Sequence, residues 1–325
     1  MNRYITLLKR EYWEHRGGFL WAPIWTAAAL LVMVFVGMGV ASWHAARTFD
    51  GEVKIGVQLQ QLLQKVPPEE MGKIVAGFEA SLSSFWAILQ VVLFFALFFY
   101  LLGALYDDRR DRSILFWKSL PVSDLETVLS KAVVALLGAP LIAWAVTVVL
   151  HVVFLTLLSV FVLFHGLNAI DLVWGPAEPL SLAIRLLAII PVNALWALPA
   201  VGWLLLVSAF ARSKPFLWAV ALPVAIGAAI SVFDLLQALR IPDFWYWQHI
   251  VARILLSLVP AGWLASDFFA RGGGLASGDG SASELVTWSM LGNALGSTEL
   301  WVGVVAGVAM IAAAVYFRGN RELAD

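Results

Sequence analysis

The sequence predicts an all-α integral membrane protein, on the basis of its composition, its hydropathy and the lengths of its apolar runs. Hydrophobic residues make up 61% of the 325 residues, charged residues only 13%, and the mean hydropathy is +0.85. Soluble domains are about half apolar and about a quarter charged. Because about 20 apolar residues suffice to cross a bilayer as a helix, we divide the chain into spans.

Six apolar runs are predicted to be transmembrane helices. The predicted spans are residues 19–42, 84–105, 132–164, 183–210, 215–233 and 300–317. The third run is longer than a hydrocarbon core of about 30 Å requires, and Gly138 and Pro140 offer a point at which it can kink. Pro191, Pro199 and Pro223 lie inside the fourth and fifth runs. Since such prolines free backbone carbonyls, these helices are expected to pack within a bundle.

Polar segments separate some of these spans. Residues 43–82 are predicted to form a solvent-facing helical hairpin outside the cytoplasm, and residues 235–298 are placed on the same side. Within the latter, residues 244–269 are apolar enough to span but contain Arg253 and Pro260. We predict a re-entrant or interfacial helix pair there, before the last span.

Basic residues indicate the orientation in the membrane. The side that holds both termini, including a predicted amphipathic helix over residues 1–18, carries 13 of the 21 basic residues. These are Arg3, Lys9, Arg10, Arg16, Arg109, Arg110, Arg112, Lys118, Lys131, Arg212, Lys214, Arg318 and Arg321. The positive-inside rule therefore places both termini in the cytoplasm.

The chain lacks the common signatures of catalysis and metal binding. It contains no cysteine, no G-x-x-x-x-G-K-[ST], no H-E-x-x-H and no G-x-S-x-G. No two histidines are spaced by three or four residues, and the net charge of −1 gives no general attraction to nucleic acid. The sequence predicts a non-catalytic chain with no metal site and no bound cofactor.

His151 and Asn193 are polar residues near span interiors. A polar residue at this depth is a candidate for the path of a transported molecule. It can equally form a hydrogen bond to a neighbouring helix, which is the more common role and the one we favour. Both interpretations stay open from the sequence.

Residues 106–131 form the most informative segment. A charged run, Tyr106 to Arg112, ends the second span, and a short apolar-rich piece, Ser113 to Leu120, follows it. Ser123 and Glu126 have the spacing of a capping box, which predicts a new helix start. A charge run alone is usually a solvated surface. The successive aliphatic and aromatic residues between the charges favour instead a contact with a soluble protein.

This segment resembles the link between the second and third spans, bearing the coupling helix, in membrane subunits of the type-2 ATP-binding-cassette exporter family. Residues 7–16 resemble the amphipathic helix that lies on the cytoplasmic membrane face before the first span. The order of six spans and the re-entrant element resemble the family over essentially the whole chain. The long polar hairpin 43–82 departs from that pattern, so no substrate is carried over.

The resemblance implies a permease in a bacterial inner membrane that pairs with a second copy, as a homodimer, and with two nucleotide-binding subunits. ATP and Mg would bind those partner subunits. The side chains expected to dock on the ATPase are Ile114, Phe116, Trp117 and Leu120, oriented by Arg109, Arg110, Arg112 and Lys118, with Tyr12 and Glu14 on the same surface. The alternative is a membrane-embedded sensor or scaffold that binds a ligand or partner through residues 43–82 and 235–298.

Overall fold

The described part of the chain is a bundle of long helices. The computed structural model describes residues 3–48, 68–119, 121–164, 168–235, 245–260 and 288–320, and every secondary-structure element within these ranges is helical. Five helical stretches among them are long and apolar enough to cross a membrane: Gly17–His44, Ala80–Arg110, Asp124–Phe164, Ile170–Phe210 and Thr298–Asn320. The prediction of an all-α, multi-pass membrane protein is therefore confirmed at this level.

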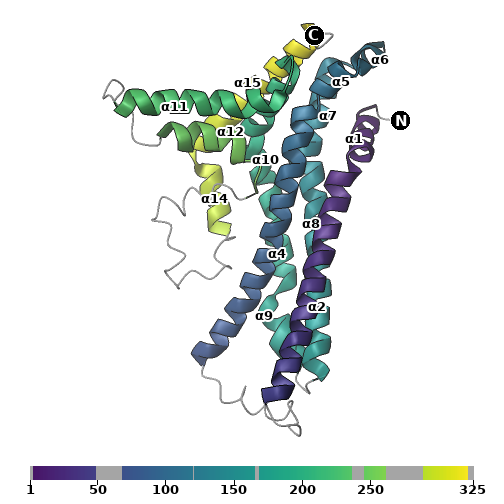
Figure 1. Cartoon of the computed structure of the whole chain (residues 1–325), viewed down its shortest axis with the longest axis vertical. Helices are drawn as coiled ribbons and strands as arrows, with labels where there is room; N and C mark the ends of the chain where they lie inside the picture. The colour runs from purple at the N-terminus through teal and green to yellow at the C-terminus, as the bar shows by residue number, and fades with distance from the viewer. Residues whose placement is uncertain are drawn as a thin grey trace.

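The long helices pack into one bundle, and the last of them lies only toward the end that carries the C-terminus (Figure 1). They are α2 (Ala22–Thr48), α4 (Pro68–Gly103), α8 (Ala139–Phe164), α10 (Pro179–Phe210) and α15 (Thr298–Asn320). Shorter α-helices are α1 (Arg3–Glu14), α5 (Tyr106–Arg110), α6 (Ser113–Ser119), α7 (Asp124–Val133), α9 (Gly175–Ala177), α11 (Leu222–Leu235), α12 (Ala252–Leu256) and α14 (Trp288–Gly296). Five π-helical turns are η1 (Gly17–Trp21), η2 (Val134–Gly138), η3 (Ile170–Trp174), η4 (Leu217–Ala221) and η5 (Trp247–Val251).

The predicted kink in the third span coincides with a π-helical turn. The turn η2 ends at Gly138, and the α-helix resumes at Ala139, immediately before Pro140. Since proline cannot donate an intrahelical hydrogen bond, a wider turn just before it accommodates the missing donor. Helices α7 and α8 thus form one long stretch interrupted at the position that the sequence indicated.

The predicted hairpin 43–82 differs in its described parts. Helix α2 continues to Thr48, and α4 begins at Pro68 and runs unbroken into the second span. These parts are extensions of the flanking spans, and residues 49–67 lie outside the described ranges.

The fifth predicted span is not among the five long apolar helices. Its apolar stretch, Leu217–Phe233, is shorter than they are, and Figure 1 shows α11 lying across the bundle axis near the C-terminal end of α15. The prediction of six spans is therefore not confirmed. Of the predicted re-entrant pair, residues 245–256 are helical, as η5 and α12, and residues 261–269 lie outside the described ranges.

Helices α10 and α15 pack closely and run parallel. Gly303 lies at Pro199, Gly307 at Gly202, and farther along Phe317 approaches Phe210. A Cβ at Gly202 would lie 2.6 Å from the Gly307 carbonyl oxygen. Gly303 and Gly307 form a G-x-x-x-G motif, which lets two helix backbones approach in a membrane. Because the helices are parallel, α15 begins away from the end of the bundle at which α10 ends.

Replacing Gly307 should separate α10 from α15. A Cβ at Gly307 would lie 2.6 Å from the Leu198 carbonyl carbon, so Gly307→Leu forces backbone displacement and should lower the free energy of unfolding by about 1–3 kcal/mol. Denaturation of the purified chain in detergent measures this. Gly39→Leu is the matched control, since a Cβ added at Gly39 would have no heavy atom within 4 Å. Equal stability of both variants would contradict the close packing.

Candidate functional site at the end that carries α1 and α6

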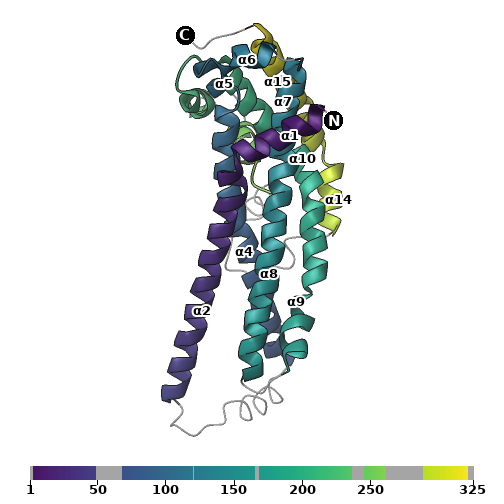
Figure 2. The same cartoon turned by 90° about the vertical axis from the view of Figure 1, so that its right-hand side faces the viewer.

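The segment over residues 106–131 lies at the end of the bundle where α1 begins and α15 ends (Figure 2). Arg112 adopts a left-handed conformation, φ 58°, and turns the chain between α5 and α6. Helix α7 then begins with the predicted capping box. The Ser123 hydroxyl accepts a hydrogen bond from the Glu126 amide at 3.1 Å, and the Ser123 amide donates to the Glu126 carboxylate at 2.8 Å. This prediction is confirmed.

Arg109 anchors α5 to the end of α10 rather than facing a partner. Its side chain is buried, and Nη2 donates to the carbonyl oxygens of Ser208 at 2.7 Å and Ala211 at 3.0 Å. Carbonyls at a helix C-terminus lack intrahelical partners, and a cation satisfies them. The Ser208 hydroxyl also accepts hydrogen bonds from the amides of Leu105 and Tyr106, both at 2.9 Å. Arg109 thus has a structural role inside the bundle, and its orienting role at an ATPase contact stays a prediction.

The exposed apolar side chains of α6 are Leu115 and Phe116, at 51% and 59% exposure. Ile114, expected to dock on a partner, is 0% exposed and belongs to the core. Successive residues of an α-helix point about 100° apart, so neighbours cannot all face outward. Trp117 is half-buried, and the guanidinium carbon of Arg10 lies 3.4 Å from the centroid of the Trp117 ring. Leu120 lies outside the described residues.

The basic residues around α6 divide into two groups. Arg110 and Arg112 are exposed and border Leu115 and Phe116 in the sequence; we call these four residues the α6 surface. Lys118 is instead half-buried and donates to the Gly319 carbonyl at 3.2 Å, which ties α6 to the end of α15.

Helix α1 contributes the remaining two predicted contact residues. Tyr12 is half-buried, and Glu14 is exposed and accepts a hydrogen bond from Arg10 Nε at 2.7 Å. Since Arg10 also stacks on Trp117, the Arg10 side chain connects Glu14 to α6. Helix α1 thus lies beside α6, and the hydrogen bond to Glu14 fixes the Arg10 side chain between them.

A buried ion-pair network joins α15 to α5 and α7. The Arg318 side chain is 2% exposed and donates to Asp108 and to Asp124, both at 3.1 Å. In the sequence Arg318 indicated only the orientation of the chain, and this structural role was missed. An arginine that directly follows an apolar span, with acidic residues at the ends of two other helices, is the signal that could have indicated it.

A second buried ion pair joins α1 to α7 and α4. Lys131 Nζ donates to the Glu11 carboxylate at 3.1 and 3.3 Å, and the Tyr100 hydroxyl donates to Glu11 at 2.9 Å. Glu11 and Lys131 are both nearly fully buried. Burial of one charge here requires the other, so this contact fixes where α1 crosses the bundle.

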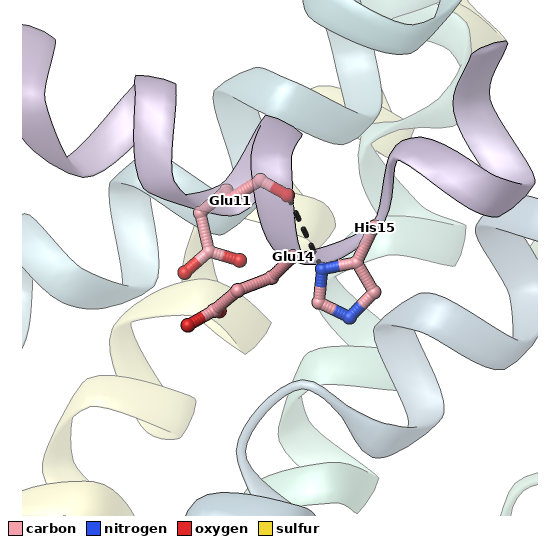
Figure 3. A group of neighbouring side chains, drawn as sticks. All are labelled: Glu11, Glu14 and His15. Atoms are coloured by element: carbon pink, nitrogen blue, oxygen red, sulfur yellow. Dashed lines mark hydrogen bonds between the residues drawn. The ribbon is translucent and has the colours of Figure 1, made fainter.

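Glu11, Glu14 and His15 form a group whose ligand atoms lie within 4.8 Å of one another (Figure 3). That spacing would suit a metal ion, but each of the three possible ligand side chains already contacts another group of the chain. Glu11 is paired with Lys131, Glu14 with Arg10, and His15 Nδ1 lies 3.2 Å from the Glu11 carbonyl oxygen. A metal ion would have to displace two cations of the chain itself, so the group fits a structural role better than a metal centre.

The two candidate pathway residues lie in different surroundings. His151 is buried, and its Nε2 lies 3.0 Å from the Leu82 carbonyl, so it links α8 to α4. Asn193 is buried on α10, and among the described residues its Oδ1 has no hydrogen-bond partner. His151 therefore contacts a neighbouring helix, whereas the side-chain oxygen of Asn193 accepts no hydrogen bond from the described residues.

The fold and the site define an all-α, multi-pass membrane protein with a short, partly exposed helix between two long ones at the end that carries α1. No protein-family model, no curated protein and no solved structure matches the chain. Its function is therefore inferred from this geometry and from the sequence.

Removing the Arg318 side chain should destabilise the bundle end. Arg318→Met leaves Asp108 and Asp124 without their cation and should lower the free energy of unfolding by roughly 1–3 kcal/mol. The exposed Arg110 provides the control, because Arg110→Met removes the same charge where solvent already satisfies it. Denaturation curves of both variants in the same detergent test this, and similar curves would refute the structural role of Arg318.

The Glu11–Lys131 pair should show strong coupling. Lys131→Met leaves the Glu11 carboxylate buried without a cation, and Glu11→Leu leaves the lysine buried without an anion, so each single change should cost about 3 kcal/mol. The double variant should be more stable than the sum of the two losses predicts. A double-mutant cycle on unfolding free energies measures the coupling. Additive losses would mean that the two charges do not interact.

Proposed function

We propose that the chain is the membrane-spanning subunit of an ATP-binding-cassette exporter, which forms the translocation path while separate ATPase subunits dock on the α6 surface. The observation that carries the proposal is the exposed pair Leu115 and Phe116 on a short helix between two long apolar helices. Interfaces depend on a few well-packed aromatic and aliphatic anchors with a polar rim. Phe116 and Leu115 supply the anchors, and Arg110 and Arg112 the rim.

The contacts of α5 and α6 suit a coupling element. Lys118 ties α6 to Gly319 of α15, and Arg109 ties α5 to the end of α10. Arg318 connects α15 to α5 and α7. A displacement of α6 by a bound ATPase would therefore be transmitted to four longer elements, α4, α7, α10 and α15. This supports a role in coupling ATP-driven closure of the partner to movement of the helices.

The chain direction supports a six-pass arrangement with both ends in the cytoplasm. Helix α1 and the end of α15 both contact α7, and α10 and α15 are parallel. Helix α15 therefore begins beside the middle of α10, away from the end at Phe210, which is compatible with a re-entrant element before the last helix. The basic residues concentrated at this end support a cytoplasmic location for it, by the positive-inside rule.

The proposed partners follow from this assignment. ATP and Mg would bind the ATPase subunits, and a second copy of this chain would complete the exporter as a homodimer. Helix α2 exposes large apolar side chains, including Met33, Phe35 and Val36, that suit lipid or a second copy. An apolar helix face needs one of these in a membrane, so α2 is the first surface to examine for dimer contacts.

Loss of the two anchors should abolish the docking of the ATPase. The double variant Leu115→Ala/Phe116→Ala should weaken co-purification with the nucleotide-binding subunit by about 1,000-fold, because such anchors each contribute about 2 kcal/mol or more and about 1.4 kcal/mol corresponds to a factor of ten. The measurement is pull-down and ATPase stimulation after co-expression with candidate nucleotide-binding subunits that carry a Walker motif.

Phe164→Ala is the matched control, because Phe164 is a highly exposed aromatic residue at the C-terminal end of α8, away from the α6 surface. It should leave complex formation unchanged. Full complex formation by the double variant would refute docking on α6. Failure of the unaltered chain to bind any ATPase would refute the exporter assignment itself.

A further inference from the structure

A group of buried polar side chains lies between α4, α10 and α12, away from the α6 surface. Arg253 is 7% exposed, and Ser257, Asn193 and Gln90 are buried at least as completely. Among the described residues, five of their atoms have no hydrogen-bond partner: Arg253 Nη1 and Nη2, Ser257 Oγ, Asn193 Oδ1 and Gln90 Oε1. Buried polar atoms are almost always paired in folded proteins, so such a concentration indicates a missing partner.

Arg253 is held so that its hydrogen-bond donors remain unused. Its guanidinium carbon lies 3.2 Å from the centroid of the Trp196 ring, and Gly303 lies against Nη2, where a Cβ would approach to 2.6 Å. Stacking on an aromatic ring occupies one face of the guanidinium and leaves the N–H groups at its edge. These form a planar fork that matches the oxygens of a phosphate or a carboxylate.

The guanidinium lies beside the apolar helix α15, far from its C-terminal end. Gly303, which it contacts, precedes Arg318 by 15 residues on α15, which is about 22 Å along the helix axis. Glu299, one turn before Gly303, is exposed and acts on Arg253 through space, but no ion pair joins them. A cation beside an apolar helix without a paired anion marks a place where a ligand or an ion is bound.

The unpaired atoms of Ser257, Asn193 and Gln90 follow Arg253 toward the N-terminal end of α10. Ser257 follows Arg253 by one turn, and Asn193 precedes Trp196 by one turn on α10. Asn193, Gln90 and Pro260 line a cavity of about 10 Å³, which has room for a single water. Donors at Arg253 and Ser257 are therefore followed by two acceptor oxygens, on Asn193 and Gln90.

We propose that Arg253, Ser257, Asn193 and Gln90 bind the headgroup of an anionic amphiphile. Arg253 and Ser257 donate hydrogen bonds to its phosphate or carboxylate oxygens. Asn193 and Gln90 accept hydrogen bonds from a hydroxyl or ammonium group next to the anion. Leu256, 55% exposed on the same short helix, offers apolar surface for the chain of the ligand.

The cavity as it stands admits one water, so headgroup binding requires the five-residue helix α12 to move away from α10. The proposal goes beyond the exporter assignment, because binding to this site needs no ATPase. Its test therefore uses the purified full-length chain alone, and its failure would leave the docking experiment unaffected.

The test is a titration of the chain in a neutral detergent, followed by native mass spectrometry. The main probe is oleoyl lysophosphatidic acid, which combines a phosphate, a neighbouring hydroxyl and an apolar chain. Monoolein lacks the phosphate, and inorganic phosphate lacks the apolar chain. We expect both to bind at least tenfold more weakly than lysophosphatidic acid. Inorganic phosphate binding as tightly as the lipid would overturn the assignment to an amphiphile.

Arg253→Met should weaken binding of lysophosphatidic acid at least tenfold, and Ser257→Ala and Asn193→Leu about threefold each. Arg185→Met is the matched control, since it removes a half-buried arginine of α10 more than two turns from Asn193. It should keep the original affinity. Unchanged affinity in Arg253→Met, or an equal loss in Arg185→Met, would overturn the proposal.

Two further variants keep the test decisive if Arg253→Met does not fold. Arg253→Lys retains the charge but loses the planar fork, and should weaken binding at least threefold. Ser257→Ala removes only a hydroxyl and is expected to fold normally. If both variants bind lysophosphatidic acid as the original chain does, the site does not recognise the anionic headgroup.

Discussion

The arrangement of the bundle end depends on burying the Arg318 guanidinium between Asp108 and Asp124. A buried cation is stable only when its anions are held at hydrogen-bond distance, so three elements, α5, α7 and α15, must meet at one point. The buried Arg109 similarly joins α5 to the end of α10, through hydrogen bonds to backbone carbonyls. Together they join the helix ends around α5, and Lys118 ties α6 to the same place through Gly319 of α15.

The sequence predicted those features that depend on local chemistry. Composition and run length predict apolar helices, and the spacing of Ser123 and Glu126 predicts a helix start that the structure confirms. Pro140 predicts a break, which takes the form of a π-helical turn just before it. In each case the physical cause lies within a few residues of the effect.

The sequence failed where tertiary contacts decide the outcome. Which of Ile114 and Leu115 faces outward depends on the rotation of α6, and that is set by packing against α5 and the ends of other helices. Arg109 is buried because carbonyls about 100 residues later in the chain accept its hydrogen bonds. No pattern around Arg109 contains that information. Likewise, the sequence shows Arg253 only as a charge that interrupts an apolar run. The structure shows that its guanidinium packs against Trp196 and Gly303.

The central claim, that a partner docks on α6, is tested most directly by site-specific cross-linking. The chain contains no cysteine, so Ser119→Cys creates a single reactive thiol at the exposed end of α6, next to the α6 surface, and leaves both anchors intact. A photoactivatable maleimide on that thiol should cross-link to a nucleotide-binding subunit in membranes, and the same reagent on Phe164→Cys should not. Cross-linking to the ATPase from neither position, or equally from both, would contradict the account.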